Sequence, residues 1–378
     1  MSRTAITNAT IVTVDDHDTV MEGGTIVIDG EVIAEILGPD AQPREQVDEV
    51  IDAAGGFVMP GLINAHTHLA MTAFRGFADD VNLQDFLGQL FPAEAKVMSD
   101  QHVRIGVRAA FAEALLSGCT AALDMYWFAS ASSEEAARAG FRLETGPIFI
   151  GSNGPDNIVF EQRLVDAQAS APHNWILAHG TYTMSPEQLE VVGKLAQLQG
   201  ARFHIHASEN AGEVADIQKR YGRTPVELLD DHQLLRSGTV LAHCVVLTDA
   251  EIARLAETGT AVAHCPSSNM KLASGFCRVT ELLEAGVVVG LGTDGPSSSN
   301  DLDMFNAMRM AALIHKGSRL DPTAVPASAV LRMATMGSAA ALGISDVVGS
   351  LEVGKRADIV RLDPMSPSLT PSYDPTST

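Results

Sequence analysis

The sequence predicts an α/β fold, namely a (β/α)8 TIM barrel with a small β-sandwich domain built from both chain ends. Three observations support this prediction. The chain has 378 residues, of which 46% are hydrophobic, which suits one large barrel with an accessory domain. Short apolar runs alternate with amphipathic stretches over residues 57–345. Strand-like segments separated by turn residues stand before and after this region.

Residues 1–56 read as short strands with turns between them. Apolar and β-branched residues fill 9–14, 24–30 and 31–36, which is the composition of β-strands. The step from Asp29 to Gly30 between two of these runs is a typical hairpin turn. We therefore expect residues 1–56 to form the N-terminal part of the β-sandwich.

From residue 57 the pattern changes to alternating strands and helices. Amphipathic helices are expected at 99–116, 187–199, 249–257 and 278–283. The expected strands are 57–63, 120–123, 146–150, 175–178, 202–206, 239–242, 261–263 and 287–291, with 141–145 as an alternative third strand. Because the alternation runs through eight strands, a barrel over residues 57–345 is favoured over an open sheet.

Residues 346–378 return to strand-like sequence. The segment 351–362 places β-branched residues around the turn residue Gly354, so we expect it to rejoin the N-terminal β-domain as a shortened return. The segment from Asp363 is rich in Ser, Pro and Thr, which predicts a disordered tail.

Composition and charge narrow the classes of function. The formal net charge is −22, which argues against nucleic acid and membrane partners, because both favour basic patches. No apolar run reaches the ~18 residues of a membrane helix, and no signal-peptide pattern is present. The four cysteines form no CxxC pair, so we expect buried thiols in a reducing compartment. We therefore expect a cytoplasmic homo-oligomer that acts on a small molecule and water.

The pair His66 and His68 is the most informative local feature. It follows the apolar run 57–59. Side chains two residues apart on a strand point to one face, so the two imidazoles converge at the mouth of a buried strand. Imidazole is the commonest protein ligand for zinc-like metals. The pair therefore predicts half of a metal site.

Other strand ends carry groups that can complete this site, and in a barrel the chemistry lies at the C-terminal strand ends. The residues at or near the ends of the expected fourth, fifth, sixth and eighth strands are His179, His206, His243 and Asp294. A zinc-like ion takes several nitrogen or oxygen ligands and keeps one position open for water. The predicted metal ligands are His66, His68, His206 and Asp294.

Three residues are predicted to carry the catalysis. A bound divalent metal lowers the pKa of water from about 15.7 towards ~7 and so supplies hydroxide near neutral pH. Glu209, three residues after His206, can take the proton of that water and deliver it to a substrate nitrogen. His243 can hydrogen-bond the attacking water or an oxygen forming on the substrate. Asp294 can also share the water as a base.

Each of these residues has a more ordinary reading when taken alone. A single strand-end histidine is usually a hydrogen-bonded polar residue, and an aspartate before glycine usually forms a turn. The ordered set favours the metal site. His204 shares a face with His206 one layer deeper, which favours a packing or ligand-orienting role. His264, at the expected seventh strand, could line the site or serve in packing.

These motifs resemble those of the amidohydrolase superfamily over nearly the whole chain. The matching segments are 60–68, 206–209, 242–244, 292–295 and 354–360. Within the superfamily, segments 221–227, 265–275 and 302–305 are similar to the branch that contains S-adenosylhomocysteine/5-methylthioadenosine deaminases and atrazine chlorohydrolase-like enzymes. The motifs are specific to the branch and less so to one substrate.

The resemblance implies one divalent metal, zinc in the first place and Fe2+ as the alternative. Relatives with two metals bridge them through a carbamylated lysine on the fourth strand, where this chain has His179. The resemblance places the metal on the four predicted ligands, Glu209 as proton shuttle and His243 on the water. It also implies two substrate-binding residues: Glu94 matches a ribose-binding glutamate, and His179 matches a histidine that contacts substrate.

We therefore predict a metal-dependent hydrolytic deaminase that releases ammonia from an amino-substituted N-heterocycle. Adenosine, 5′-methylthioadenosine and S-adenosylhomocysteine are the substrates that the resemblance implies. Residues 143–153 offer no clear counterpart of the arginines that hold the homocysteine carboxylate in relatives, so a smaller, less charged heterocycle fits as well. One alternative is an s-triazine-type chlorohydrolase or aminohydrolase. An alternative of another class is a non-catalytic amidohydrolase-like scaffold.

Overall fold

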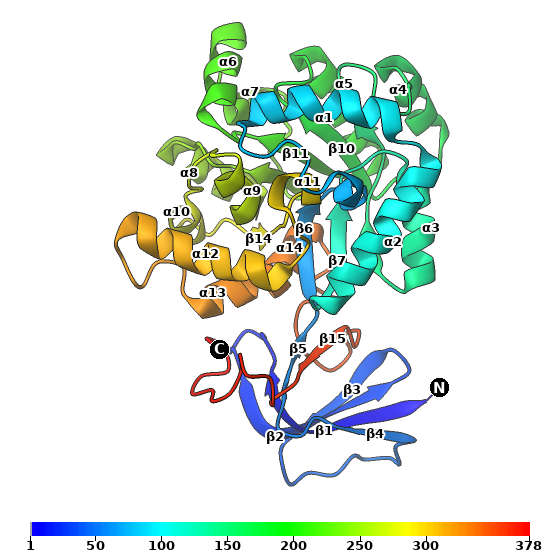
Figure 1. The fold of residues 1–378 in the computed structure, drawn as a ribbon, viewed down its shortest axis with the longest axis vertical. Helices are drawn as coiled ribbons and strands as arrows, with labels where there is room; N and C mark the ends of the chain where they lie inside the picture. Colours follow the sequence, from blue (N-terminus) through cyan, green and yellow to red (C-terminus); the bar gives the residue numbers. More distant parts are fainter. Residues whose placement is uncertain (1) are drawn as a thin grey trace.

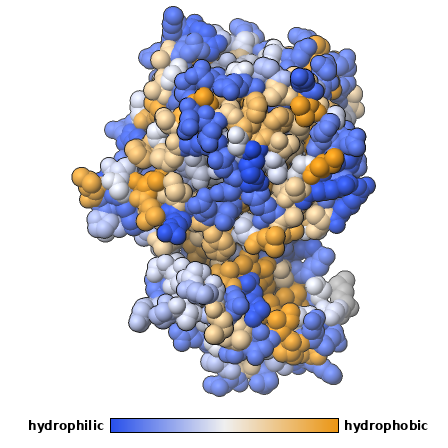
Figure 2. All heavy atoms as spheres, viewed as in Figure 1, coloured by the Kyte–Doolittle hydropathy of each residue, from blue (hydrophilic) through white to orange (hydrophobic). Residues whose placement is uncertain are grey.

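The computed structural model describes residues 2–378 and shows a small β part beside a larger α/β part (Figure 1). Both marked chain ends lie near the small part, and the continuous run from β5 into β6 crosses between the two parts (Figure 1). The visible surface is largely hydrophilic, with hydrophobic residues gathered where the two parts meet (Figure 2). No helix among the described residues has the length and apolar character needed to span a membrane.

The small part is built around one six-stranded sheet. Its strands are β1 (Arg3–Val12), β2 (Val20–Asp29), β3 (Val32–Leu37), β4 (Glu49–Asp52), β5 (Phe57–Pro60) and β15 (Ile359–Leu362). The order is β15-β5-β1-β2-β3, and β4 pairs with β1 as well. The expected turn at Gly30 joins β2 to β3, with φ of 62° at the glycine. β15 pairs antiparallel with β5, so residues 359–362 lie in the same sheet as the N-terminal strands.

The larger part contains two parallel sheets. One holds β6 (Leu62–Thr67), β7 (Cys119–Asp124) and β8 (Arg142–Glu144). The other holds β9 (Ile148–Phe149), β10 (Trp175–Gly180), β11 (Arg202–Ala207), β12 (Thr239–His243), β13 (Ala261–His264) and β14 (Val289–Leu291). Most of their residues are buried, as in parallel sheets that are covered on both faces. The structure thus has the parallel α/β architecture that the sequence predicts.

Hydrogen bonds link the first and last of these strands. The backbone amide of Asp294 donates to the carbonyl of His66 at 3.0 Å. The side-chain amide of Asn64 donates to the hydroxyl of Thr293 at 2.7 Å. The ends of β6 and β14 therefore lie side by side, although 229 positions separate Asn64 from Thr293.

Two expected strands differ from the structure. The run 57–63 is divided at Gly61, where a side chain would meet Thr120; β5 belongs to the small sheet and β6 to the parallel sheet. The third strand is β8, which lies in the alternative segment 141–145, and 146–150 contributes only the two residues of β9. Pro147 separates β8 from β9, and proline has no amide to donate to a strand ladder.

Helices surround the parallel strands and α1 crosses in front of their upper ends (Figure 1). They are α1 (Leu83–Val97), α2 (Asp100–Leu116), α3 (Ala129–Ala139), α4 (Phe160–Ala169), α5 (Pro186–Gln199), α6 (Ala211–Tyr221), α7 (Pro225–Asp231), α8 (Asp249–Thr258), α9 (Pro266–Lys271), α10 (Val279–Glu284), α11 (Pro296–Ser299), α12 (Met304–Arg319), α13 (Ala327–Arg332) and α14 (Ser338–Leu342). A 3-10 helix (Leu69–Phe74) follows β6, and a π-helix (Met333–Gly337) precedes α14. The four expected helices appear as α2, α5, α8 and α10. The helix α5 begins where Ser185 and Gln188 form a capping box.

His264 packs away from the predicted site, against His315 of α12. Their Nε2 atoms lie 3.2 Å apart, and both side chains are buried. Burial, assisted by the nearby Arg319 cation, lowers the pKa of His315 to about 4. Of the two roles left open for His264, the structure thus supports packing.

We expect this pair to make the fold sensitive to acid. Between the ordinary histidine pKa of 6.5 and about 4, His315 is neutral in the folded state and protonated in the unfolded state. The unfolded chain then binds more protons, so stability falls as the pH falls through this window. The melting temperature of the wild type should therefore drop more steeply from pH 6.5 to 4.5 than that of His315→Gln. The exposed His102 supplies the control, because His102→Gln should keep the wild-type slope; equal slopes for all three proteins would contradict the assignment.

Candidate metal centre and active site

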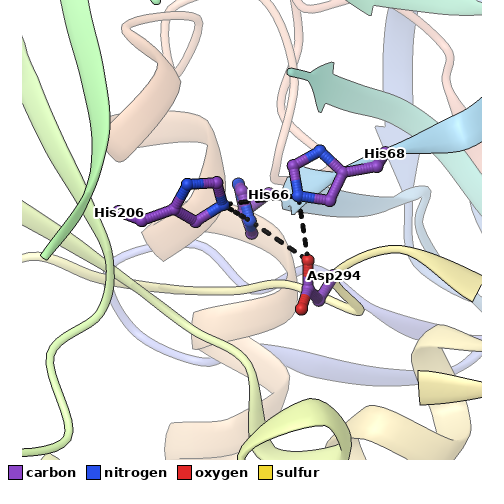
Figure 3. A group of neighbouring side chains, drawn as sticks. All are labelled: His66, His68, His206 and Asp294. Carbon is purple, nitrogen blue, oxygen red and sulfur yellow. Dashed lines mark hydrogen bonds and ion pairs between the residues drawn. The ribbon is translucent and has the colours of Figure 1, made fainter. Parts of the chain in front are cut away.

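Four side chains converge where β6, β11 and β14 end (Figure 3). His66, His68, His206 and Asp294 are all buried. His206 Nε2 lies 3.1 Å from His66 Nε2 and 3.3 Å from His68 Nε2. Asp294 Oδ1 lies 3.3 Å from His66 Nε2 and 3.1 Å from His68 Nε2. Ligand atoms that each lie about 2.0–2.2 Å from one ion are roughly 3 Å apart, so the four atoms can hold one divalent ion.

The other ring nitrogen of each histidine is bound to the protein, which fixes the tautomer. His68 Nδ1 lies 2.5 Å from the Met125 carbonyl, and His206 Nδ1 contacts the His179 carbonyl. A carbonyl oxygen can only accept, so each Nδ1 carries the proton and donates it. Each Nε2 is left with its lone pair facing the cluster. This is the arrangement in which a neutral imidazole binds a metal.

A hydrogen bond to His204 likewise keeps the proton of His66 on Nδ1 and the lone pair on Nε2. The Nδ1 of His204 donates to the Val240 carbonyl at 2.8 Å, which leaves its Nε2 as an acceptor. That Nε2 lies 2.7 Å from His66 Nδ1, so His66 donates to His204 and keeps its own Nε2 lone pair for the cluster. The ligand-orienting role expected for His204 therefore fits the geometry.

Replacing His204 should weaken metal binding. His204→Phe leaves the buried Nδ1–H of His66 without an acceptor, and loss of such a partner typically lowers metal affinity about 10- to 100-fold. We expect this loss in a zinc titration against a competing chelator. His204→Gln is the matched variant, because its amide oxygen can accept the same hydrogen bond and should retain more affinity. Wild-type affinity in His204→Phe would remove the orienting role.

Asp294 is held by a second pair of contacts. Its Oδ2 accepts hydrogen bonds from Ser268 at 2.6 Å and Ser298 at 2.7 Å, which leaves Oδ1 for the cluster. The residue has φ of 62° and His243 has φ of 73°. Positive φ is unfavourable for residues with a Cβ and concentrates at functional sites. The backbone at these strand ends thus bends to aim side chains inward.

The electrostatics of the cluster favour a cation. Burial lowers the pKa of His66 to about 4 and takes that of His206 well below its usual value. Burial alone would raise the pKa of Asp294, but the neighbouring His66 and His68 imidazoles hold it far below its usual range. Burial would lower the pKa of His68, but Asp294 outweighs this and raises it. A carboxylate oxygen facing the Nε2 atoms of three imidazoles in a buried site is a donor set that fits a divalent metal.

Glu209 and His243 stand beside this cluster. Glu209 Oε1 lies 3.8 Å from His243 Nε2, and the Tyr182 hydroxyl lies 3.4 Å from Glu209 Oε2. Burial raises the pKa of Glu209, which suits a group that takes and releases a proton. His243 Nδ1 lies 2.9 Å from the amide oxygen of Asn269, so its Nε2 lone pair faces Glu209. The His243 ring lies 5.5 Å from both the His66 and His206 rings.

Both predicted substrate-binding residues border the cluster. The His179 ring centroid lies 5.1 Å from that of His206 and 5.4 Å from that of Phe91 on α1. Glu94, also on α1, accepts a hydrogen bond from the hydroxyl of Tyr126, whose ring lies 6.4 Å from that of His68. The structure therefore brings the predicted residues together at one place, although α1 itself was not among the expected helices.

Several residues of this site were not predicted from the sequence. They are Tyr126, Tyr182, Ser268, Asn269 and Ser298. The signal for Tyr126 was its place two residues after Asp124, where β7 ends. The serines and Asn269 lie on the short helices α9 and α11, whose contact with Asp294 and His243 follows from packing alone.

Comparisons with known proteins agree with this geometry. A profile of the amidohydrolase family matches residues 57–377. The chain is 41% identical to a 5-methylthioadenosine/S-adenosylhomocysteine deaminase from Syntrophobacter fumaroxidans, over 98% of this chain and 87% of that protein. It is also 41% identical to a 5'-deoxyadenosine deaminase from Methanosarcina mazei, over 99% of this chain and 87% of that protein.

Solved structures of two related enzymes also match the fold of this chain. An adenosine deaminase from Xanthomonas campestris with bound zinc matches with a TM-score of 0.95 at 36% identity, over 100% of this chain and 88% of that chain. An atrazine chlorohydrolase from Arthrobacter aurescens complexed with zinc matches with a TM-score of 0.89 at 28% identity, over 99% of this chain and 90% of that chain. The profile match, the identities and the shared fold together show that this chain belongs to the amidohydrolase family.

Proposed function

We propose that this chain is a zinc-dependent hydrolytic deaminase of adenine nucleosides, with His66, His68, His206 and Asp294 as metal ligands. The observation that carries the proposal is the buried four-ligand cluster with Glu209 and His243 beside it. The names of the relatives, which are deaminases of 5-methylthioadenosine, S-adenosylhomocysteine and 5'-deoxyadenosine, support the substrate class. The retained chemical residues argue against a non-catalytic scaffold.

A bound metal ion, Glu209 and His243 have separate roles in the proposed reaction. When bound, a divalent metal acts as a Lewis acid and lowers the pKa of a water molecule towards ~7. Glu209 would accept a proton from the attacking water and deliver it to the ring nitrogen next to the amine-bearing carbon. His243, with its Nε2 3.8 Å from Glu209, hydrogen-bonds the attacking oxygen. The ring carbon bonds to the water oxygen, and the second proton of the water passes to the amine nitrogen. The carbon–nitrogen bond then breaks, ammonia leaves, and the oxygen becomes the carbonyl of the product.

The nucleoside would lie between the cluster and α1. Tyr126 donates to one oxygen of Glu94, and the second oxygen is free to accept from a ribose hydroxyl. Burial lowers the pKa of His179 to about 3, so it meets the substrate as a neutral imidazole. Phe91 packs edge-on against His179 at 5.4 Å and supplies an apolar wall for a heterocycle.

The function can be tested by measuring ammonia release from the zinc-loaded protein. We expect turnover of adenosine, 5′-deoxyadenosine or 5′-methylthioadenosine, with the matching inosine-type product. Atrazine and melamine serve as the comparison substrates, because a triazine hydrolase would release chloride or act on the triazine amine instead. Triazine turnover without nucleoside turnover would replace this proposal by the alternative.

Substitution of Glu94 should change the preference among substrates more than the rate of the chemical step. A hydrogen bond to a charged group contributes about 1.5–3 kcal/mol, so Glu94→Gln should lower kcat/KM for ribonucleosides roughly 10- to 100-fold. The loss should appear mainly in KM, and free adenine should be affected little. Equal losses for nucleoside and free base would show that Glu94 does not contact the ribose.

We also propose the finer architecture and the domain limits. The bond from Asp294 to His66 supports closure of the parallel strands into a (β/α)8 barrel over residues 57–345. The six-stranded sheet supports a β-domain made of residues 1–56 and 346–378, with β5 added between β15 and β1. The sandwich form of that domain, the cytoplasmic location and the homo-oligomeric state stay predictions from the sequence.

A further inference from the structure

Glu213 is a buried carboxylate behind the loop that carries Glu209. It lies in the first turn of α6 and is 2% exposed. Its Oε2 accepts a hydrogen bond from the Glu209 amide at 2.6 Å. Its Oε1 accepts from the Ser208 amide at 3.2 Å and from the Thr181 hydroxyl at 2.5 Å. Both carboxylate oxygens are therefore used to hold two loops at the mouth of the strands.

These contacts are not those of an ordinary helix cap. The N-cap of α6 is Asn210, whose side chain already accepts from the Glu213 amide at 2.8 Å. The Glu213 carboxylate instead reaches back to amides that precede the helix. One of them belongs to Ser208, which has φ of 52°, a conformation that a serine adopts only where its surroundings impose it. The carboxylate thus stabilises the bend between His206 and Glu209.

The Glu209 carboxylate itself makes only long contacts with neighbouring side chains. Its nearest polar neighbours are the Tyr182 hydroxyl at 3.4 Å and His243 Nε2 at 3.8 Å, and both distances are long for hydrogen bonds. The position of its carboxylate therefore depends on the backbone of residues 208 and 209. Glu213 holds that backbone and, through Thr181, ties it to the loop that follows His179.

Burial of the Glu213 carboxylate without a neighbouring cation costs folding free energy. No lysine, arginine or histidine pairs with it among the described residues, and burial raises its pKa to about 7. A carboxyl group in such a place is retained only where its hydrogen bonds matter. The donors it satisfies are those of the loop that carries the proposed proton shuttle.

We propose that Glu213 is a positioning residue that fixes the position of the Glu209 carboxylate relative to the four clustered ligands and the substrate. This inference rests on the proposed function, because Glu209 must be the group that moves the proton. It acts through the backbone and does not touch the substrate. Its removal should therefore lower kcat and leave KM and zinc content close to those of the wild type.

The test compares Glu213→Gln with a matched glutamate elsewhere. Misplacement of a reacting group by about 1 Å can cost roughly 100-fold in rate, so kcat of Glu213→Gln should fall about 10- to 100-fold with KM within about twofold. Thr181→Val, which removes one donor and keeps both amide contacts, should show a smaller fall. Glu251 is the control: it is 5% exposed, stands in the first turn of α8 and bonds to Thr224 and Thr248. Glu251→Gln should lower the melting temperature similarly and leave kcat unchanged.

A double variant decides whether the effect passes through Glu209. In a Glu209→Gln background, adding Glu213→Gln should cost no further rate, because residues that act as one unit are non-additive. A crystal structure of Glu213→Gln should show the Glu209 carboxylate displaced. An unchanged kcat in Glu213→Gln, or the same loss in both backgrounds, would overturn the inference. Failure of the proposed function would look different, since the wild type would then release no ammonia from any nucleoside.

Discussion

Glu209→Gln is expected to slow ammonia release about 10²- to 10⁴-fold, the range that a positioned acid–base group contributes. Glutamine fills the same volume but cannot take a proton from water and pass it to a ring nitrogen. The residue is buried next to His243, so no bulk water can replace it easily. Because burial raises the pKa of Glu209, the acid limb of the wild-type kcat profile should lie above the pH at which a free glutamate titrates.

The measurement is single-turnover ammonia release at saturating substrate, with zinc content determined on the same sample. Glu209 is not one of the four clustered ligands, so zinc content and melting temperature should match those of the wild type. Glu227, an exposed glutamate in a capping box of α7, provides a control, and Glu227→Gln should retain wild-type kcat. Near wild-type turnover in Glu209→Gln would reject the proton-shuttle role.

Loss of the metal is expected to abolish turnover. Lewis-acid stabilisation is worth several kcal/mol, so removal of zinc with a chelator should lower the rate by at least about 10³-fold. Zinc should restore it. His206→Ala should behave like the chelated protein and should not recover with added zinc, because His206 Nε2 lies within 3.3 Å of both His66 and His68 ligand atoms.

Metal binding should also stabilise the fold. A ligand at ~1,000 times its Kd contributes about 4 kcal/mol to the folded state, so the melting temperature should rise on zinc loading of the wild type. His206→Ala should show a much smaller rise. His173 is a half-buried histidine that lies outside the cluster and contacts the Ser170 hydroxyl, and His173→Ala should keep the full zinc response. Equal responses in the two variants would place the metal elsewhere in the protein.

The main elements of the site could be predicted because they depend on local sequence periodicity. Two histidines at positions i and i+2 of a strand share a face whatever the rest of the chain does. Strand ends at one edge of a parallel sheet meet in space. These two facts were enough to bring His66, His68, His206 and Asp294 together, and the structure places them within 4.8 Å of one another.

Boundaries were harder to predict than the strands themselves. The apolar run 57–63 has no internal polar residue, so nothing in its periodicity reveals the division at Gly61. The third strand was ambiguous for a different reason, because 141–145 and 146–150 are both short. Only pairing decided these cases: Phe57 and Val58 pair with β1, whereas Leu62 pairs with Cys119 of β7.

The sequence by itself determined the α/β pattern, the four side chains that cluster at the strand ends and the Glu209 and His243 pair beside them, because strand periodicity and strand-end chemistry are local. The tertiary structure alone decided how these groups are held. Ser268 and Ser298 donate hydrogen bonds to Asp294, and Glu213 accepts a hydrogen bond from the Glu209 amide. Such contacts join residues from different strands and helices, and their partners are set by packing between elements and not by spacing along the chain.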